Sequence, residues 1–169
     1  MVSWLTGLKG LQLLPNGMGG LMMSLDIVHH QVRKDFVSKM GFPAWFPSAL
    51  GLFKLTQAAL NWVADGAYVP YAQFMLSLQL GGAVFTHTVI EGKSITRQVP
   101  PSLFFSTTIA IQHLTGKIGP LPLVLCIHSA LAAIGFASGY IIFALGAGRD
   151  SKASLLESPV KWRKSRGFA

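Results

Sequence analysis

The residues best suited to chemistry are His87 and Glu91, in the segment GGAVFTHTVIEGK. Their spacing of four residues places them on one face of a helix, where an imidazole and a carboxylate can form a hydrogen bond. Such a pair could bind a ligand or move a proton. It also suits the end of an apolar helix, where an imidazole reaches headgroup water and the helix C-terminus favours it. We interpret His87 as a boundary residue, with a ligand-binding role as the alternative.

A second polar group lies deeper in the apolar sequence. Lys54 is nine positions inside an apolar run, and Gln57 and Asn61 follow it at i+3 and i+7. These three residues share one helix face. The next apolar run carries Gln73 and Ser77. If the two helices are antiparallel, Asn61 lies opposite Gln73 and Gln57 opposite Ser77, which predicts a hydrogen-bonded seam.

The charge of Lys54 requires an explanation, because an ammonium inside a bilayer costs about 2.5–3.5 kcal/mol and usually has a partner. The nearest acid by depth is Asp26, which Lys54 could reach by extending toward the headgroups. We expect a structural ion pair between Lys54 and Asp26 or a group of another subunit. Ligand binding or proton relay is the alternative, since intramembrane charges often mark function.

Other reactive patterns are absent from the sequence. It contains no carboxylate cluster for a metal, no glycine-rich loop after a strand pattern and no recognisable Ser/His/Asp set. His113 and His128 lie on neighbouring apolar runs at unmatched depths, which argues against a haem held by both. The lone Cys126 predicts a small core residue. We expect no enzyme, metal or resident cofactor; bound lipids are expected, with a quinone or pigment as the alternative.

The composition identifies the elements that must position these residues. Only 12% of the 169 residues are charged and the mean hydropathy is +0.48, whereas soluble domains carry about 25% charged residues. Runs near the ~20 apolar residues needed to cross a bilayer occur at residues 45–64, 71–90 and 121–148. Residues 11–28 are a weaker span because they contain Pro15 and Asp26, and residues 101–116 because they are short. The sequence predicts an all-α membrane bundle.

The basic residues decide how many runs cross. If residues 11–28 and 101–116 both cross, eleven basic residues gather on one face and only Lys9 and Lys117 lie on the other. If residues 101–116 do not cross, seven basic residues lie on one face and six on the other. The positive-inside rule therefore favours five spans, with the basic face toward the matrix, stroma or cytoplasm. The rule does not decide whether residues 11–28 cross, because without that span twelve basic residues lie on one face and one on the other, which is just as asymmetric. Residues 1–148 then form one bundle, followed by a basic tail, 149–169.

Two segments on the basic face are expected to contact lipids or partners. In the connection after residue 28, Phe36 and Met40 fall at helical spacing among three basic residues, Arg33, Lys34 and Lys39. This pattern favours a short interfacial helix on anionic headgroups, with a solvated loop as the alternative.

The tail segment VKWRKSRGF combines aromatic and basic residues, and we expect a partner's pocket to hold Trp162 while acidic groups face Arg163, Lys164 and Arg166. Topology and lipid contact explain the net charge of +8 better than nucleic acid does.

The last apolar run carries small residues at helical spacing. Ser129, Ala133 and Ala137 are spaced i, i+4 and i+8, and Gly135 and Gly139 form a Gly-X-X-X-Gly pattern. Small residues at these spacings let a second helix approach closely. The sequence leaves open whether that helix belongs to this bundle or to another subunit.

Residues 39–101 resemble the DoxX-like family of small helical membrane proteins. The likeness lies in KMGFPAWFPSALGLFKL, LGGAVFTHTVIEGK and VPP, with matches at Gly41, Pro43, Gly51, Leu55, Gly82, Ala83, Thr86 and His87. It implies a bundle of four helices, to which residues 121–148 add a fifth. Where the family tends to carry an acid, this chain has Lys54. The family includes quinone-linked oxidoreductase subunits and assembly proteins, so the resemblance implies the fold more directly than a function.

These features favour a non-catalytic accessory subunit of a larger membrane complex, with other membrane subunits and anionic lipids as its partners. The expected complex is an organellar energy-converting one, namely a respiratory, ATP synthase or photosynthetic complex. The mitochondrial inner membrane is the expected location and the thylakoid the alternative. Two other functions stay open: a quinone-linked redox or small-molecule-binding protein that uses the Lys54 seam and His87, and a membrane assembly factor.

Overall fold

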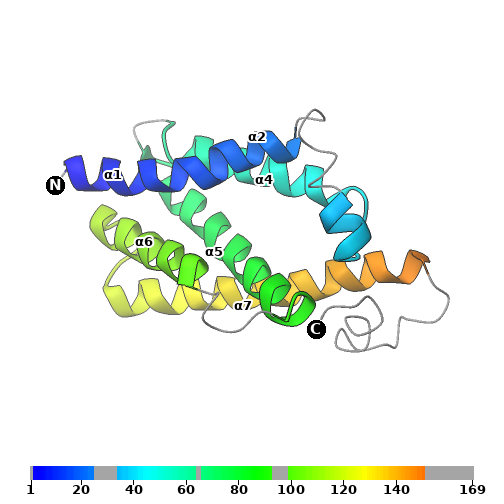
Figure 1. The fold of residues 1–169 in the computed structure, drawn as a ribbon. Coiled ribbons are helices and arrows are strands. Elements are labelled where there is room, and N and C mark those ends of the chain that lie inside the picture. The colour runs from blue at the N-terminus through cyan, green and yellow to red at the C-terminus, as the bar shows by residue number, and fades with distance from the viewer. Residues whose placement is uncertain (1, 25–33, 64–65, 93–98, 151–169) are drawn as a thin grey trace.

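The computed structural model describes residues 2–24, 34–63, 66–92 and 99–150, and throughout these residues the regular structure is helical (Figure 1). In chain order the elements are α1 (Val2–Leu13), η1 (Leu14–Met18), α2 (Gly19–Ser24), η2 (Asp35–Lys39), α4 (Phe46–Leu60), α5 (Val69–Phe85), η4 (Thr86–Ile90), α6 (Val99–Thr115) and α7 (Leu121–Asp150), where η marks a π-helical segment. The chain is therefore all-α, as the composition predicts.

Two of the π-helical segments lengthen the helices that they join. Pro15 lies in the first turn of η1, and the residues at both ends of η1 keep right-handed helical dihedral angles. Proline lacks a backbone N–H, and the wider π turn accommodates the missing hydrogen bond. The helix is thus continuous over residues 2–24, and it begins earlier than the predicted residue 11. In the same way η4 continues α5 to Ile90.

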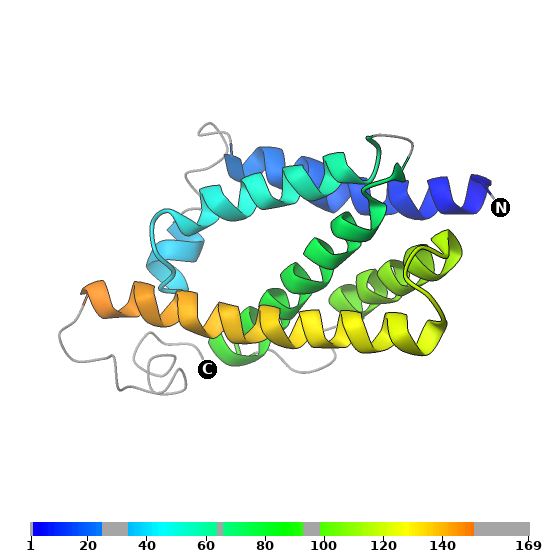
Figure 2. The same cartoon turned by 180° about the vertical axis from the view of Figure 1, so that it is seen from behind.

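Helix α5 is the central element of the bundle. It packs against α7, α6 and α4, while α2 packs against α4 and α6 against α1. Figures 1 and 2 show α5 crossing obliquely between a layer of α1, α2 and α4 and a layer of α6 and α7. Helix α7 lies very close to α5. A Cβ added to Gly135 would overlap the carbonyl of Leu78, and one added to Gly81 would overlap that of Ala132.

The segment before α4 is a helical corner packed on the bundle. Phe36 and Met40 pack against an apolar cluster of Phe42, Phe85, Ile90 and Phe143. Gly41 follows with a φ of 77°, a left-handed conformation that glycine adopts without strain. The described part of this segment is thus helical over Asp35–Lys39 and packs on the bundle, while its contact with anionic headgroups stays a prediction.

The described residues bury an unusual number of polar side chains beside an apolar core. Nine polar side chains are buried, among them Gln12, Gln73 and His128. Large apolar side chains such as Trp4, Leu103 and Leu145 are instead more than 60% exposed. Within the described ranges, only one helix, α7, is long and apolar enough to cross a membrane. The 26 residues Leu121–Gly146 have a mean hydropathy of 1.9.

Candidate functional site

A cluster of polar side chains occupies the interior between α1, α4, α5 and α6. We call it the polar core; its members are Gln12, Asn61, Gln73, Thr107 and Thr108. Gln12 and Gln73 exchange two amide hydrogen bonds, of 3.1 and 3.0 Å. Gln12 also donates to Thr107 at 3.0 Å, and Gln73 donates to Asn61 at 2.7 Å. Four helices are therefore joined through one pair of glutamines.

The predicted seam between α4 and α5 is present at one of its two positions. Asn61 and Gln73 are hydrogen-bonded, as their depths predict. The predicted pairing of Gln57 with Ser77 is wrong: Ser77 instead lies 2.7 Å from Nδ1 of His128 on α7. Gln57 is completely buried, and neither of its amide atoms has a hydrogen-bond partner among the described residues. The reason is that the Ser77 side of α5 is covered by α7 and not by α4.

Gln12, at the centre of the polar core, is not among the residues predicted from the sequence, because Pro15 and Asp26 make residues 11–28 a weak span. The available signal was the pair of amides Gln12 and Asn16, which lie one turn apart on one helix face. Asn16 donates to the Gln12 carbonyl at 3.0 Å and accepts from Gln79 at 3.0 Å. These bonds connect the polar core to Gln79, which borders a cavity.

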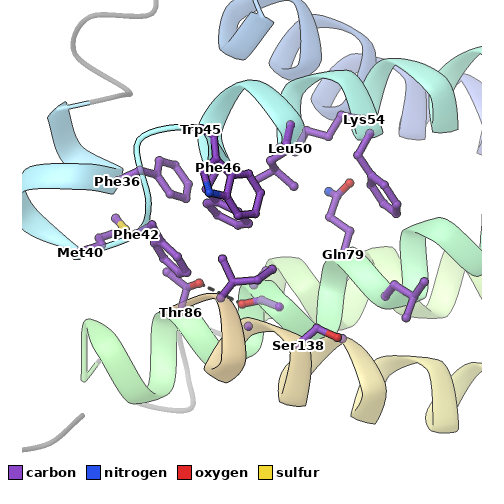
Figure 3. Close-up of a pocket in the computed structure, with 18 of the residues that line it drawn as sticks. Phe36, Met40, Phe42, Trp45, Phe46, Leu50, Lys54, Gln79, Thr86 and Ser138 are labelled. Atoms are coloured by element: carbon purple, nitrogen blue, oxygen red, sulfur yellow. Dashed lines mark hydrogen bonds between the residues drawn. The ribbon is translucent and has the colours of Figure 1, made fainter. Parts of the chain in front are cut away.

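That cavity has a volume of about 590 Å³ and lies between η2 and α4 on one side and α5 and α7 on the other (Figure 3). Its first wall is aromatic and is formed by Phe36, Phe42, Trp45, Phe46 and Phe53. Its second wall combines two larger side chains, Leu78 and Ile142, with five small residues, Gly82, Ala83, Gly135, Ser138 and Gly139. Gln79, Thr86 and His87 add polar groups to the lining, and Lys54 borders it. The volume is within the range of ligand pockets, about 300–1,000 Å³.

His87 and Glu91 form the hydrogen bond that their spacing predicts, with 2.5 Å between Nδ1 and Oε2. The His87 side chain is 34% exposed and that of Glu91 14%. Both lie at the end of η4, and His87 lines the cavity. The pair is thus both a helix-end pair and part of a cavity wall, so the two interpretations of His87 are compatible.

Lys54 lies on the side of α4 that faces α2. Its Nζ is 3.6 Å from the position that a Cβ on Gly19 would occupy, and Figure 3 shows its side chain extending away from the cavity centre. The proposed partner, Asp26, lies outside the described residues. The pairing therefore stays a prediction.

The two histidines of the later helices, His113 and His128, do not face each other. His128 is buried and bonded to Ser77, whereas His113 is exposed. Over the ranges that the structure describes, no group of three or more metal-ligating side chains is close enough to hold an ion. The prediction of a core position for Cys126 is wrong, because the residue is exposed on the outer face of α7.

The small residues of α7 divide between two faces. Gly135 and Gly139 are buried against α5, where a Cβ on Gly139 would lie 2.9 Å from the Phe85 ring. Ser129, Ala133 and Ala137 are exposed on the opposite face. The partner of the Gly-X-X-X-Gly pattern is therefore in this bundle, while Ser129, Ala133 and Ala137 are exposed.

Apart from Lys54, the basic residues whose side chains the structure describes lie toward the two ends of the bundle. At one end, Nζ of Lys9 lies 5.4 Å from the centre of the Trp62 ring, and Lys117 donates to the Gly66 carbonyl at 2.6 Å. Lys34 is exposed near the corner before α4, at the other end. The side chain of Lys39 is not described, and the other predicted contact residues, Arg33, Trp162, Arg163, Lys164 and Arg166, lie outside the described residues.

Over the described residues, the fold and the site define an all-helical protein with a buried polar cluster, many exposed apolar side chains and one helix long and apolar enough to cross a membrane. No protein-family model, curated protein or solved structure matches the chain.

Proposed function

We propose that the protein is a multi-pass membrane protein and a non-catalytic accessory subunit of a larger membrane complex. The distribution of side chains supports the first part. In a bilayer, polar groups face the bundle interior and bond across helices, as the polar core does. Exposed Trp4, Leu103 and Leu145 would then contact lipid instead of water.

Helix lengths and charges support a topology of five spans. Residues 2–24 and 69–90 are continuous helices once their π-helical segments are included, and each approaches the ~20 residues of a bilayer span. Lys9 and Lys117 lie near Gly66 at one end of the bundle, and Lys34 lies at the other. This arrangement agrees with a basic face on the side of Lys34. The DoxX-like likeness fits four of the spans, with α7 as the fifth.

The observation that carries the accessory role is the exposed face formed by Ser129, Ala133 and Ala137. It lies on the most apolar helix, opposite the face that packs on α5. Small residues allow close helix approach, which drives association in lipid through van der Waals contact. We assign this face to a helix of another subunit. An organellar energy-converting complex, with anionic lipids at the basic face, is the assembly that we propose.

Native electrophoresis of detergent-extracted membranes tests this role. Ala133→Leu should shift the protein from a large complex to a small species, because the added side chain holds the neighbouring helix away. Ala59→Leu is the matched control, since Ala59 is also exposed but lies on α4. The accessory role is refuted if the unmodified protein migrates alone, and the assigned face is wrong if both variants stay in the complex. Substoichiometric association would favour an assembly factor.

The cavity favours a second candidate function, the binding of a lipophilic small molecule. Its lining is mostly apolar with a few polar groups, which is the usual character of such sites. A quinone-linked redox role belongs to this candidate. Purification of the protein with a coloured or extractable lipophile would support it.

A further inference from the structure

We propose that the cavity binds a flat lipid of the sterol type, whose hydroxyl donates a hydrogen bond to Nε2 of His87. The proposal rests on the second candidate function and names its ligand class. Three features of the cavity carry it: the hydrogen-bonding state of His87, the shape of the two walls, and the depth over which the cavity extends.

Glu91 determines what His87 can offer a ligand. An ionised carboxylate only accepts hydrogen bonds, so the contact of 2.5 Å with Oε2 places a proton on Nδ1 of His87. In the neutral imidazole the other nitrogen, Nε2, is then an acceptor. Because His87 lines the cavity, a matching ligand carries a donor at this end. An alcohol fulfils this condition, whereas a ketone or an ester does not.

The two walls form a slot suited to a flat molecule. On the aromatic side the rings of Phe42 and Phe46 are stacked, with centroids 4.5 Å apart and an interplanar angle of 18°. On the opposite side the lining includes Gly82, Ala83 and Ser138, which carry small side chains or none, beside Leu78 and Ile142. A rigid ring system can contact both walls at once and loses little conformational entropy on binding.

The depth of the cavity distinguishes a fused ring system from a single ring. Along α5 the lining runs from Leu78 to His87, a rise of about 13 Å at 1.5 Å per residue. A single ring would occupy only one part of this length. In the proposed topology His87 lies at the basic face, so the ligand hydroxyl would lie at headgroup level with the rings in the hydrocarbon region. A sterol could therefore enter from the bilayer without changing its depth.

The test compares two sterols that differ at one end of the ring system, one with a C3 hydroxyl that can donate and one with a C3 ketone that can only accept. The full-length protein in nanodiscs is labelled with a photoreactive cholesterol analogue, and labelling is competed with cholesterol or with its ketone, cholest-4-en-3-one. We expect cholesterol to compete about five- to tenfold better, the effect of one hydrogen bond. Equal competition would overturn the assigned role of His87.

Variants locate the binding. His87→Phe keeps an aromatic side chain but removes the acceptor, and should abolish the preference for the alcohol. Ala83→Trp should fill the slot and abolish labelling, whereas Ala59→Trp on the outer surface should not. Full labelling of a monodisperse Ala83→Trp variant would place the ligand elsewhere. Stronger competition by decylhydroquinone than by cholesterol would show a single-ring occupant and overturn the sterol class. If no lipophile competes, the second candidate function fails as well.

Discussion

The polar core should contribute most of its stabilisation through Gln73, and Gln73→Leu tests this directly. The substitution removes both hydrogen bonds with Gln12 and the bond of 2.7 Å with Asn61. Leucine retains a similar side-chain volume, so the change is confined largely to hydrogen bonding. Because Gln73 joins three helices, its loss weakens contacts that hold α1, α4 and α5 together.

The magnitude follows from the number of bonds. Interhelical hydrogen bonds in membrane proteins average about 0.6 kcal/mol, so three bonds amount to roughly 2 kcal/mol. Asn61 also keeps a buried carbonyl without its donor, which adds about 1–3 kcal/mol. We expect a loss of roughly 3–5 kcal/mol in the free energy of unfolding. Gln12→Leu should be coupled to Gln73→Leu by roughly 1 kcal/mol, because both variants remove the same two bonds.

The assay is unfolding of the purified protein in mixed micelles of increasing SDS content, followed by tryptophan fluorescence. Gln57→Leu is the matched control, since Gln57 is equally buried but has no hydrogen-bond partner in the described part of the chain. Removal of an unpaired buried amide should leave stability unchanged or raise it. Equal destabilisation by Gln73→Leu and Gln57→Leu would refute the reasoning, because it would show that volume and not hydrogen bonding determines the cost.

Three further predictions concern packing, topology and charge. Gly135→Leu should prevent α5 and α7 from meeting and sharply lower the yield of monodisperse protein, and an unchanged yield would contradict the close approach. With Cys126 replaced by serine, cysteines at positions 34 and 117, in place of Lys34 and Lys117, should react with impermeant reagents from opposite faces; reaction from one face would exclude five spans. Lys54→Met should largely preserve assembly, because apolar packing can often replace a buried ion pair. Normal assembly with a specific loss of electron transfer would instead favour the redox alternative.

The sequence predicts contacts correctly where two helices are held together by a short connection. Asn61 and Gln73 flank the turn between α4 and α5, so their depths match in the structure as in the sequence. Further from that turn the same matching fails, because α5 crosses obliquely between the two layers (Figure 2). Ser77 therefore meets His128 instead of Gln57. A crossing angle depends on the packing of both helices, which depth matching along the sequence does not include.

The glycine pattern of α7 likewise predicts a close helix contact without predicting which helix makes it. Gly135 and Gly139 predict a close approach, and they make one. The spacing carries no information on which helix approaches, because any helix with a small residue at the crossing fits. Here Gly81 provides that small residue on α5. The exposed Cys126 shows the converse error, since an apolar run in a membrane helix includes its lipid-facing side.

The polar core and the cavity have a common origin in the path of α4. Near Asn61, α4 is close enough to α5 for a direct amide bond. Toward its beginning α4 separates from α5, and the side chains of Phe53 and Phe46 line an open space instead of a helix contact. Gln57 lies between these regions, where α4 no longer meets the polar side of α5, and it is left without a partner in the described residues. A ligand that drew α4 toward α5 would therefore act on both features, and its binding should change the effect of Gln57→Leu on stability.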